Sequence, residues 1–135
     1  MRRVVVDTNC LLASINPHTP YYRLYELFET EAFEWVVGNE ILTEYEGVLT
    51  RHYSARTAHL VLTILTVAPN THFQEAYYKW QLVAADPDDH KFADVALAAG
   101  TDYLITNDRH FQPLLDLEFP RVPIVTLQEF LVAFE

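Results

Sequence analysis

One stretch of sequence decides the fold: residues 86–108, which read DPDDHKFADVALAAGTDYLITND. It opens with Asp86 at a helix N-cap position, followed by Pro87, the residue favoured at the first helical position. Apolar residues then recur at helical spacing up to Gly100, a typical helix terminator. Residues 103–105 are apolar and are followed by three polar residues, as expected for a short buried strand that leads into a loop. The stretch therefore predicts a helix followed by a strand, which is half of a β-α-β repeat.

The same alternation continues outward in both directions. Residues 2–6 are β-branched and apolar, and they predict a buried strand that delivers a polar loop at residues 7–9. Residues 70–85 are ambiguous between a short strand and a helix. Asn39 is the expected N-cap of the helix at 39–52, and residues 126–129 read as a capping box. The further predicted elements are helices near 21–32, 54–68 and 109–115 and from Thr126, and strands at 33–37 and 122–125. This order predicts a parallel sheet with helices on both faces.

Length and composition limit the class of protein. The chain has 135 residues, of which 50% are apolar and 13% aromatic, so we expect one folded domain over residues 1–135. The single cysteine, Cys10, excludes an internal disulfide framework and a Cys-rich zinc module. No apolar run is long enough for a membrane span or a signal peptide, and we expect a cytoplasmic protein. The formal net charge of -10 argues against non-specific nucleic-acid binding.

Acidic residues follow two of the predicted strands. Asp7 and Asp108 each come after a strand, and Asp89 falls in the first turn of the helix that begins at residue 86. If the strands are parallel neighbours, the three carboxylates point into one crevice, where they repel unless a cation such as Mg²⁺ or Mn²⁺ lies among them. Glu44 and Glu46 flank the apolar stripe of the helix at 39–52, and spacing does not choose between them. Each acid alone could instead cap a helix or lie on a solvated face.

These motifs together resemble PIN-domain proteins. Residues 4–9 (VVVDTN) resemble their first strand, and residues 40–45 (EILTEY) resemble their second motif, whose acid falls on Glu44. Residues 86–108 are the most specific match and are similar to the branch of toxins from toxin–antitoxin pairs, although Asn107 stands where this branch often has Gly. The resemblance covers nearly the whole chain, but residues 54–85 match the family only in the general character of their sequence and contain none of its motifs.

The resemblance implies an α/β/α sandwich with the activity of a Mg²⁺- or Mn²⁺-dependent endoribonuclease. The metal-site acids carried over from the family are Asp7, Glu44, Asp89 and Asp108. Three further positions would support the site: Asn9, Thr106 and Asp88. Asp94 points away from the apolar face of its helix and is not expected to be a primary ligand. We expect His90 and His110, which flank the acids, to be solvated.

An RNA substrate would need local cations despite the acidic composition. The candidates are Arg51, Arg56, Lys91 and Arg109. A basic segment of an antitoxin would suit the remaining acidic surface. The apolar and aromatic helix at 21–32 suggests self-association as a homodimer.

Two other functions stay open at this point. A phosphatase of the haloacid-dehalogenase type also has an Asp after its first strand, but it needs a second acid two residues on, where this chain has Asn9. A non-catalytic PIN-like module that binds RNA or acts as a scaffold would not need the four acids, and all four are present.

Overall fold

The computed structural model describes residues 1–83 and 87–134 of the chain. Within them a five-stranded, wholly parallel sheet lies at the centre, in the order β3-β2-β1-β4-β5. The middle strand β1 pairs with β2 on one side and with β4 on the other, so that Val4 lies opposite both Trp35 and Tyr103. The strands are β1 (Arg2–Val6), β2 (Phe33–Val37), β3 (Thr71–Phe73), β4 (Tyr103–Ile105) and β5 (Ile124–Val125).

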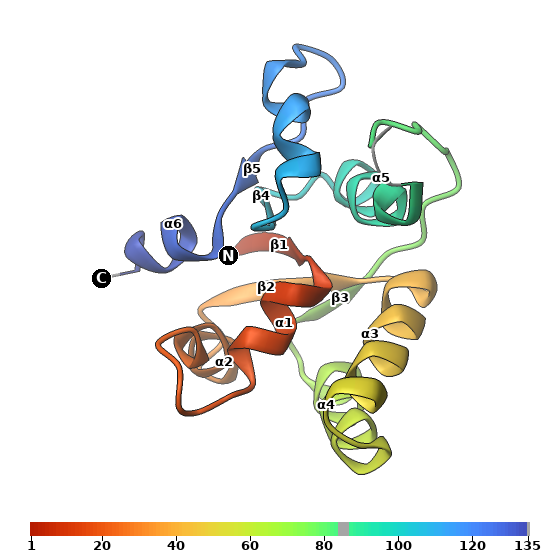
Figure 1. Ribbon diagram of the computed structural model, residues 1–135. Helices are drawn as coiled ribbons and strands as arrows, with labels where there is room; N and C mark the ends of the chain where they lie inside the picture. The colour runs from red at the N-terminus through yellow and green to blue at the C-terminus, as the bar shows by residue number, and fades with distance from the viewer. Residues whose placement is uncertain (84–86, 135) are drawn as a thin grey trace.

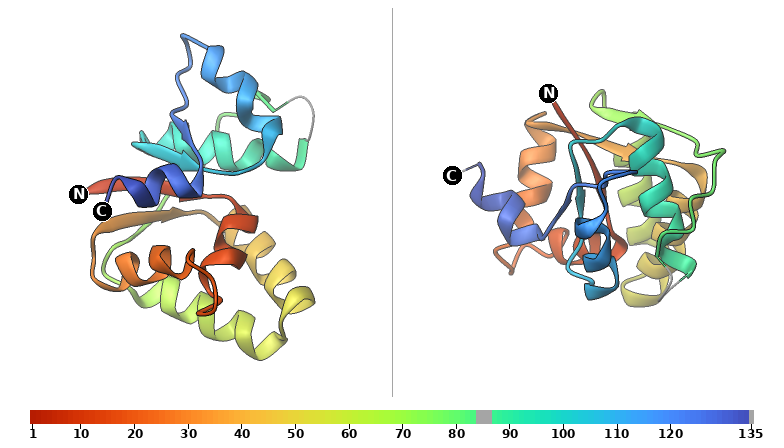
Figure 2. Two further views of the ribbon diagram at one scale, coloured as in Figure 1. Left: turned by 60° about the vertical axis from the view of Figure 1, so that its left-hand side comes forward. Right: turned by 90° about the horizontal axis from the view of Figure 1, so that it is seen from above.

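Helices cover both faces of this sheet. Figures 1 and 2 show α2 and α6 on one face and α3 and α5 on the other, with α4 packed against α3 beside β3. The helices are α1 (Thr8–Ser14), α2 (Tyr22–Glu29), α3 (Asn39–His52), α4 (Ala55–Val67), α5 (His90–Ala99) and α6 (Leu127–Val132), and the 3₁₀ segments are η1 (Pro87–Asp89) and η2 (Arg109–Asp116). The predicted α/β/α sandwich with a parallel sheet is therefore confirmed. No helix in the described part of the chain is long and apolar enough to cross a membrane.

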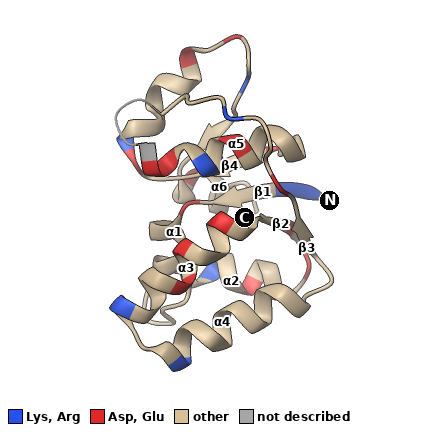
Figure 3. Ribbon diagram, turned by 90° about the vertical axis from the view of Figure 1, so that its right-hand side faces the viewer, with Lys and Arg blue, Asp and Glu red and all other residues tan. Residues whose placement is uncertain are grey.

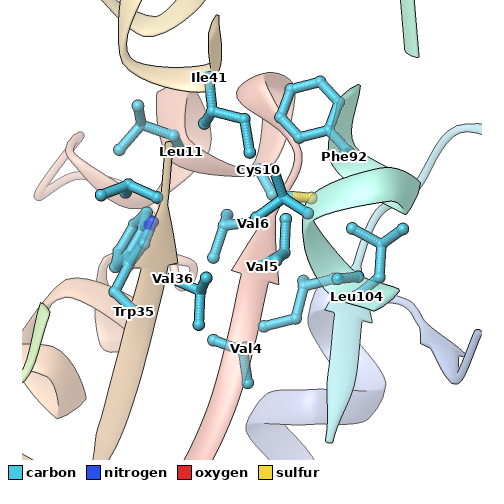
Figure 4. Close-up of a cluster of buried hydrophobic side chains, with 14 of the residues drawn as sticks. Val4, Val5, Val6, Cys10, Leu11, Trp35, Val36, Ile41, Phe92 and Leu104 are labelled. Atoms are coloured by element: carbon cyan, nitrogen blue, oxygen red, sulfur yellow. The ribbon is translucent and has the colours of Figure 1, made fainter. Parts of the chain in front are cut away.

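The core explains why β1 is apolar at successive positions. Val4, Val5 and Val6 are all fully buried, because helices lie above and below the strand. Figure 4 shows them surrounded by side chains from neighbouring elements, including Ile41 of α3 and Phe92 of α5. Each such buried side chain contributes about 1.5–3 kcal/mol through removal of apolar surface from water.

Aromatic rings fill the other layer, between the sheet and the helices α2 and α6. Phe28 of α2 meets Trp35 of β2 edge-on with ring centroids 5.3 Å apart. Phe130 of α6 meets Phe33 of β2 in the same manner at 5.4 Å. These contacts join the two helices to the same strand.

Several local predictions from the sequence need correction. Residues 8 and 9 do not form a loop: α1 begins at Thr8, because the Asp7 carboxylate accepts a hydrogen bond from the Thr8 backbone N–H and so caps the helix. Asn39 is the first helical residue of α3, and the N-cap is Gly38. A Cβ at Gly38 would lie 2.7 Å from the Gln74 carbonyl oxygen, so this close approach requires glycine.

Other elements are present but shorter than predicted. The helix expected at 21–32 is Tyr22–Glu29, and the last strand is Ile124–Val125 rather than 122–125. In the ambiguous segment 70–85 the structure has the short strand β3, and residues 74–83 have no helix or strand. Asp86, the expected N-cap, lies outside the described residues, and the chain enters α5 through the 3₁₀ turn η1. Gly100 ends α5 with φ +60°, as predicted.

Candidate functional site

The order in which the chain adds strands to the sheet reverses between β1 and β4, while all strands stay parallel. From β1 the chain proceeds outward to β2 and β3, and it then crosses to β4 and β5 on the opposite side. Ligands of open parallel sheets bind at the carboxyl ends of the strands at such a point. Asp7 lies there, with its backbone N–H donating to the Ile105 carbonyl oxygen at 2.9 Å. Asp108 follows β4 at the same edge, as the parallel pairing predicts.

Asp7 is buried, and both of its carboxylate oxygens accept hydrogen bonds. The Thr8 N–H donates to Oδ1 at 2.8 Å, and the Thr106 hydroxyl donates to Oδ2 at 2.7 Å. The same Thr106 hydroxyl oxygen accepts from the Asp108 N–H at 3.0 Å, so it connects the two acids. Burial raises the pKa of Asp7 above its usual value, the two threonine hydrogen bonds oppose this, and the charges of Glu44 and Asp108 add to it. The three carboxylates therefore lie close enough to repel.

Glu44 reaches this site from α3. The Thr8 hydroxyl donates to Glu44 Oε2, and Lys91 Nζ lies 2.9 Å from Glu44 Oε1. The next residue, Tyr45, is fully buried, and its hydroxyl donates to the Val6 carbonyl oxygen at the end of β1. That contact holds α3 against β1 and places Glu44 beside Asp7. Glu46 is exposed, so the tertiary structure distinguishes two acids that spacing could not.

Asp89 and Asp108 form the other side of the site together with His110. One ligand atom from each of the three residues lies within 4.8 Å of the others. Ligands on opposite sides of a Mg²⁺ ion with bonds of about 2.1 Å are about 4.2 Å apart, so small side-chain shifts would bring these atoms to an ion. The two carboxylates suit Mg²⁺ or Mn²⁺, whereas the imidazole of His110 is a ligand more typical of transition metals. We call Asp7, Glu44, Asp89 and Asp108 the acidic cluster; Figure 3 shows acidic positions on both α3 and the start of α5.

The supporting candidates differ in position. Thr106 bridges Asp7 and Asp108, whereas Asn9 is exposed in the first turn of α1. Asp88 is exposed in η1, and its carbonyl oxygen accepts a hydrogen bond from Lys91 Nζ.

Three other polar residues near α5 have structural contacts. Asp94 is buried on α5, where it accepts from the Trp80 N–H at 3.0 Å, and burial raises its pKa. His90 was expected to be solvated but is half-buried, with its Nε2 2.9 Å from the Val83 carbonyl oxygen. Asn107 accepts from the Leu127 N–H at 3.1 Å, which ties the loop after β4 to α6. Cys10 is a buried core residue whose pKa burial raises to about 12.

The four basic candidates are not grouped. Arg51 and Arg56 are exposed at the end of α3 and the start of α4, and Arg109 is exposed at the first position of η2. Lys91 instead pairs with Glu44 inside the site.

Sequence reasoning missed two residues of this site. Thr8 touches both Asp7 and Glu44, and its position directly after Asp7 in the first motif was the available signal. His110 was expected to be solvated; it is exposed, yet its Nδ1 lies 3.4 Å from Asp108 Oδ1. Its spacing of two residues from Asp108 carries no such signal, because the 3₁₀ geometry of η2 brings the two side chains together.

Comparison with known proteins gives the following matches. The family model described as PIN domain matches residues 3–110. The structure is similar to that of VapBC2 from Rickettsia felis bound to a DNA fragment from their promoter, with TM-score 0.62 and 17% identity over 92% of this chain and 98% of the other. It is also similar to DNA-bound VapBC from Salmonella typhimurium, with TM-score 0.62 and 16% identity over 94% and 99% of the two chains.

A third similar structure is the PIN domain of RRP44 from T. brucei, with TM-score 0.51 and 13% identity over 98% of this chain and 81% of the other. At these identities the likeness shows the fold alone. No curated protein sequence matches the chain.

Proposed function

Because this chain belongs to the PIN domain family, we propose that it is a metal-dependent endoribonuclease and the toxin of a toxin–antitoxin pair. The observation that carries the proposal is that acids from four separate segments lie together at the reversal point of the sheet. Asp89 and Asp108 lie in one group, Thr106 joins Asp108 to Asp7, and Thr8 joins Asp7 to Glu44. The likeness to two VapBC structures, which are toxin–antitoxin complexes, supports the toxin assignment.

The donor set of the site fits Mg²⁺ or Mn²⁺. Asp89 and Asp108 would hold the ion, with Asp7 beside Asp108 and with His110 as a further donor. When bound, such an ion offsets the negative charge that develops on the phosphate oxygens during attack by water.

The chain's own residues hold the acids and orient the reactants. The Thr8 N–H and the Thr106 hydroxyl donate to the two oxygens of Asp7. These hydrogen bonds hold the carboxylate in one orientation and stabilise its charged form against the neighbouring negative charges. The lone pairs of Glu44 that Thr8 and Lys91 leave open, together with Asp89, would accept hydrogen bonds from the attacking water and orient it toward the scissile phosphodiester of RNA. Pre-ordered groups of this kind contribute to rate because they need no rearrangement during the reaction.

The acidic composition predicts weak and salt-sensitive RNA binding. Removing the four acids of the cluster from the 19 acidic residues leaves 15 acids against 9 basic residues, a formal charge of -6. Arg51, Arg56 and Arg109, which are exposed, are the proposed contacts for RNA phosphates, whereas Lys91 pairs with Glu44. The remaining acidic surface suits a basic segment of an antitoxin.

Cleavage of a generic single-stranded RNA tests the enzymatic proposal. Activity is expected with Mg²⁺ or Mn²⁺ and is expected to disappear with EDTA. Asp7→Asn and Asp108→Asn should each lower the rate by more than the roughly 10–100-fold that loss of an outer hydrogen-bond partner costs a metal site. Asp116→Asn, at an exposed acid at the end of η2, is the matched control and should leave the rate unchanged.

The same assay separates the two alternatives. Metal-independent RNA binding without cleavage would favour a non-catalytic RNA-binding or scaffold module. Turnover of a small phosphomonoester without RNA cleavage would favour a phosphatase, although Asn9 is exposed on α1 where that chemistry needs an acid.

The proposed assembly has its own tests. A pull-down from the native host should recover a small partner protein encoded alongside this chain, in a complex that lacks nuclease activity, and recovery of no such partner would contradict the toxin assignment. Light scattering should give the mass of a homodimer, and a monodisperse monomer would contradict that part of the proposal.

A further inference from the structure

Lys91 lies mostly buried beside Glu44, one member of the acidic cluster. Its side chain is 16% exposed, and its Nζ is 2.9 Å from Glu44 Oε1. The same Nζ donates to the Asp88 carbonyl oxygen and lies 5.6 Å from the centre of the Phe92 ring. An ammonium group held by an anion, a carbonyl oxygen and an aromatic face is fixed in place, which distinguishes Lys91 from a mobile surface lysine.

Glu44 is correspondingly occupied by groups of the chain itself. Lys91 contacts its Oε1, and the Thr8 hydroxyl donates to its Oε2. Its side chain is 25% exposed, so solvent weakens the pairing with Lys91 only in part. Glu44 therefore differs from Asp89 and Asp108, whose ligand atoms lie together with that of His110 in one small group.

A fixed ammonium group also opposes a second ion. A divalent cation bound to Glu44 would lie next to the charge of Lys91, and like charges repel strongly where water is partly excluded. The cation position at Glu44 is thus already filled by the protein.

We propose that Lys91 is a built-in counter-ion for Glu44, a positioning residue that limits this site to one divalent ion on the side of Asp89 and Asp108. The inference rests on the proposed function in so far as that function includes a metal ion. It also assigns Lys91 a role different from the phosphate contact expected from its sequence position.

Counting Mn²⁺ ions on the full-length chain by isothermal titration calorimetry tests the inference without an activity measurement. We expect about one ion per chain for the unchanged protein and for Lys91→Arg, which keeps the charge. Lys91→Met removes the charge at similar length, and about two ions should then bind because Glu44 is left as an unpaired carboxylate. Two ions on the unchanged protein, or one ion on a folded Lys91→Met, would overturn the proposal.

Glu44→Gln gives an independent measurement should Lys91→Met not fold. If Lys91 rather than the metal neutralises Glu44, this variant should change the Mn²⁺ affinity by less than about 3-fold, whereas Asp108→Asn should weaken it by more than about 10-fold. Equal losses from both variants would make Glu44 a metal ligand and overturn the inference. Binding of one Mn²⁺ without any RNA cleavage would refute the nuclease proposal and leave this inference standing.

Discussion

The hydroxyl group of Tyr45 should contribute measurably to stability, because it links helix α3 to the end of β1 inside the core. The side chain is fully buried, its O–H donates to the Val6 carbonyl oxygen, and its oxygen accepts from Trp35 Nε1 at 3.3 Å. Tyr45→Phe keeps the ring and removes both hydrogen bonds, so two buried polar groups lose this partner. Each such loss costs about 1–3 kcal/mol, and we expect the free energy of unfolding to fall by about 2–4 kcal/mol.

Tyr53→Phe is the matched control, because it also removes a tyrosine hydroxyl group, at the end of the same helix α3, but from an exposed side chain. The Tyr53 residue is 45% exposed, and its hydroxyl donates to the Leu12 carbonyl oxygen at 3.2 Å. Water replaces that partner, so the change in stability should stay within about 0.5 kcal/mol. Urea unfolding followed by circular dichroism measures both variants. A loss below about 1 kcal/mol for Tyr45→Phe, or equal losses in the two variants, would refute the assignment of this contact as a buried anchor.

Three further predictions concern backbone geometry and buried charge. Gly38→Ala should cost about 1–3 kcal/mol in urea unfolding, because its Cβ would lie 2.7 Å from the Gln74 carbonyl oxygen; an unchanged midpoint would contradict this. Gly100→Ala meets no atom within 4 Å but must keep φ +60°, so thermal unfolding should show a loss of about 1–2 kcal/mol from strain alone, and a gain in stability would contradict it. Burial raises the pKa of Asp94, so the folded state binds its proton more tightly and loses stability as the pH rises above about 4 through that raised pKa. Asp94→Asn keeps an acceptor for Trp80 and should be more stable than the unchanged protein at pH 7 but not at pH 3; a constant difference across urea titrations at these pH values would refute this.

Features set by neighbouring residues could be predicted from the sequence. Gly100 ends α5 because only glycine readily takes its left-handed conformation, and Thr126 with Glu129 forms the predicted capping box in α6. The apolar run at 4–6 predicted a strand buried on both faces. From that, the parallel arrangement and the common edge shared by Asp7 and Asp108 followed.

Features that depend on contacts between distant segments could not be predicted. The Thr8 hydroxyl reaches Glu44 across 36 residues, and this contact, with the Tyr45 anchor, is what distinguishes Glu44 from Glu46. On an isolated helix both acids border the same apolar stripe, and their energies there are nearly alike.

The sequence by itself therefore determined most of the elements, although not α1 or β3, and it determined the parallel sheet and the acids at its carboxyl edge, since cap, turn and burial preferences act over a few residues. The tertiary structure alone decided which side chains meet: Lys91 with Glu44, His110 with Asp108, and Thr106 between Asp7 and Asp108. The physical reason is that a charge or hydroxyl group interacts through space with whatever the packing of α3, α5 and the sheet brings within a few ångströms. Spacing along the chain does not encode those distances.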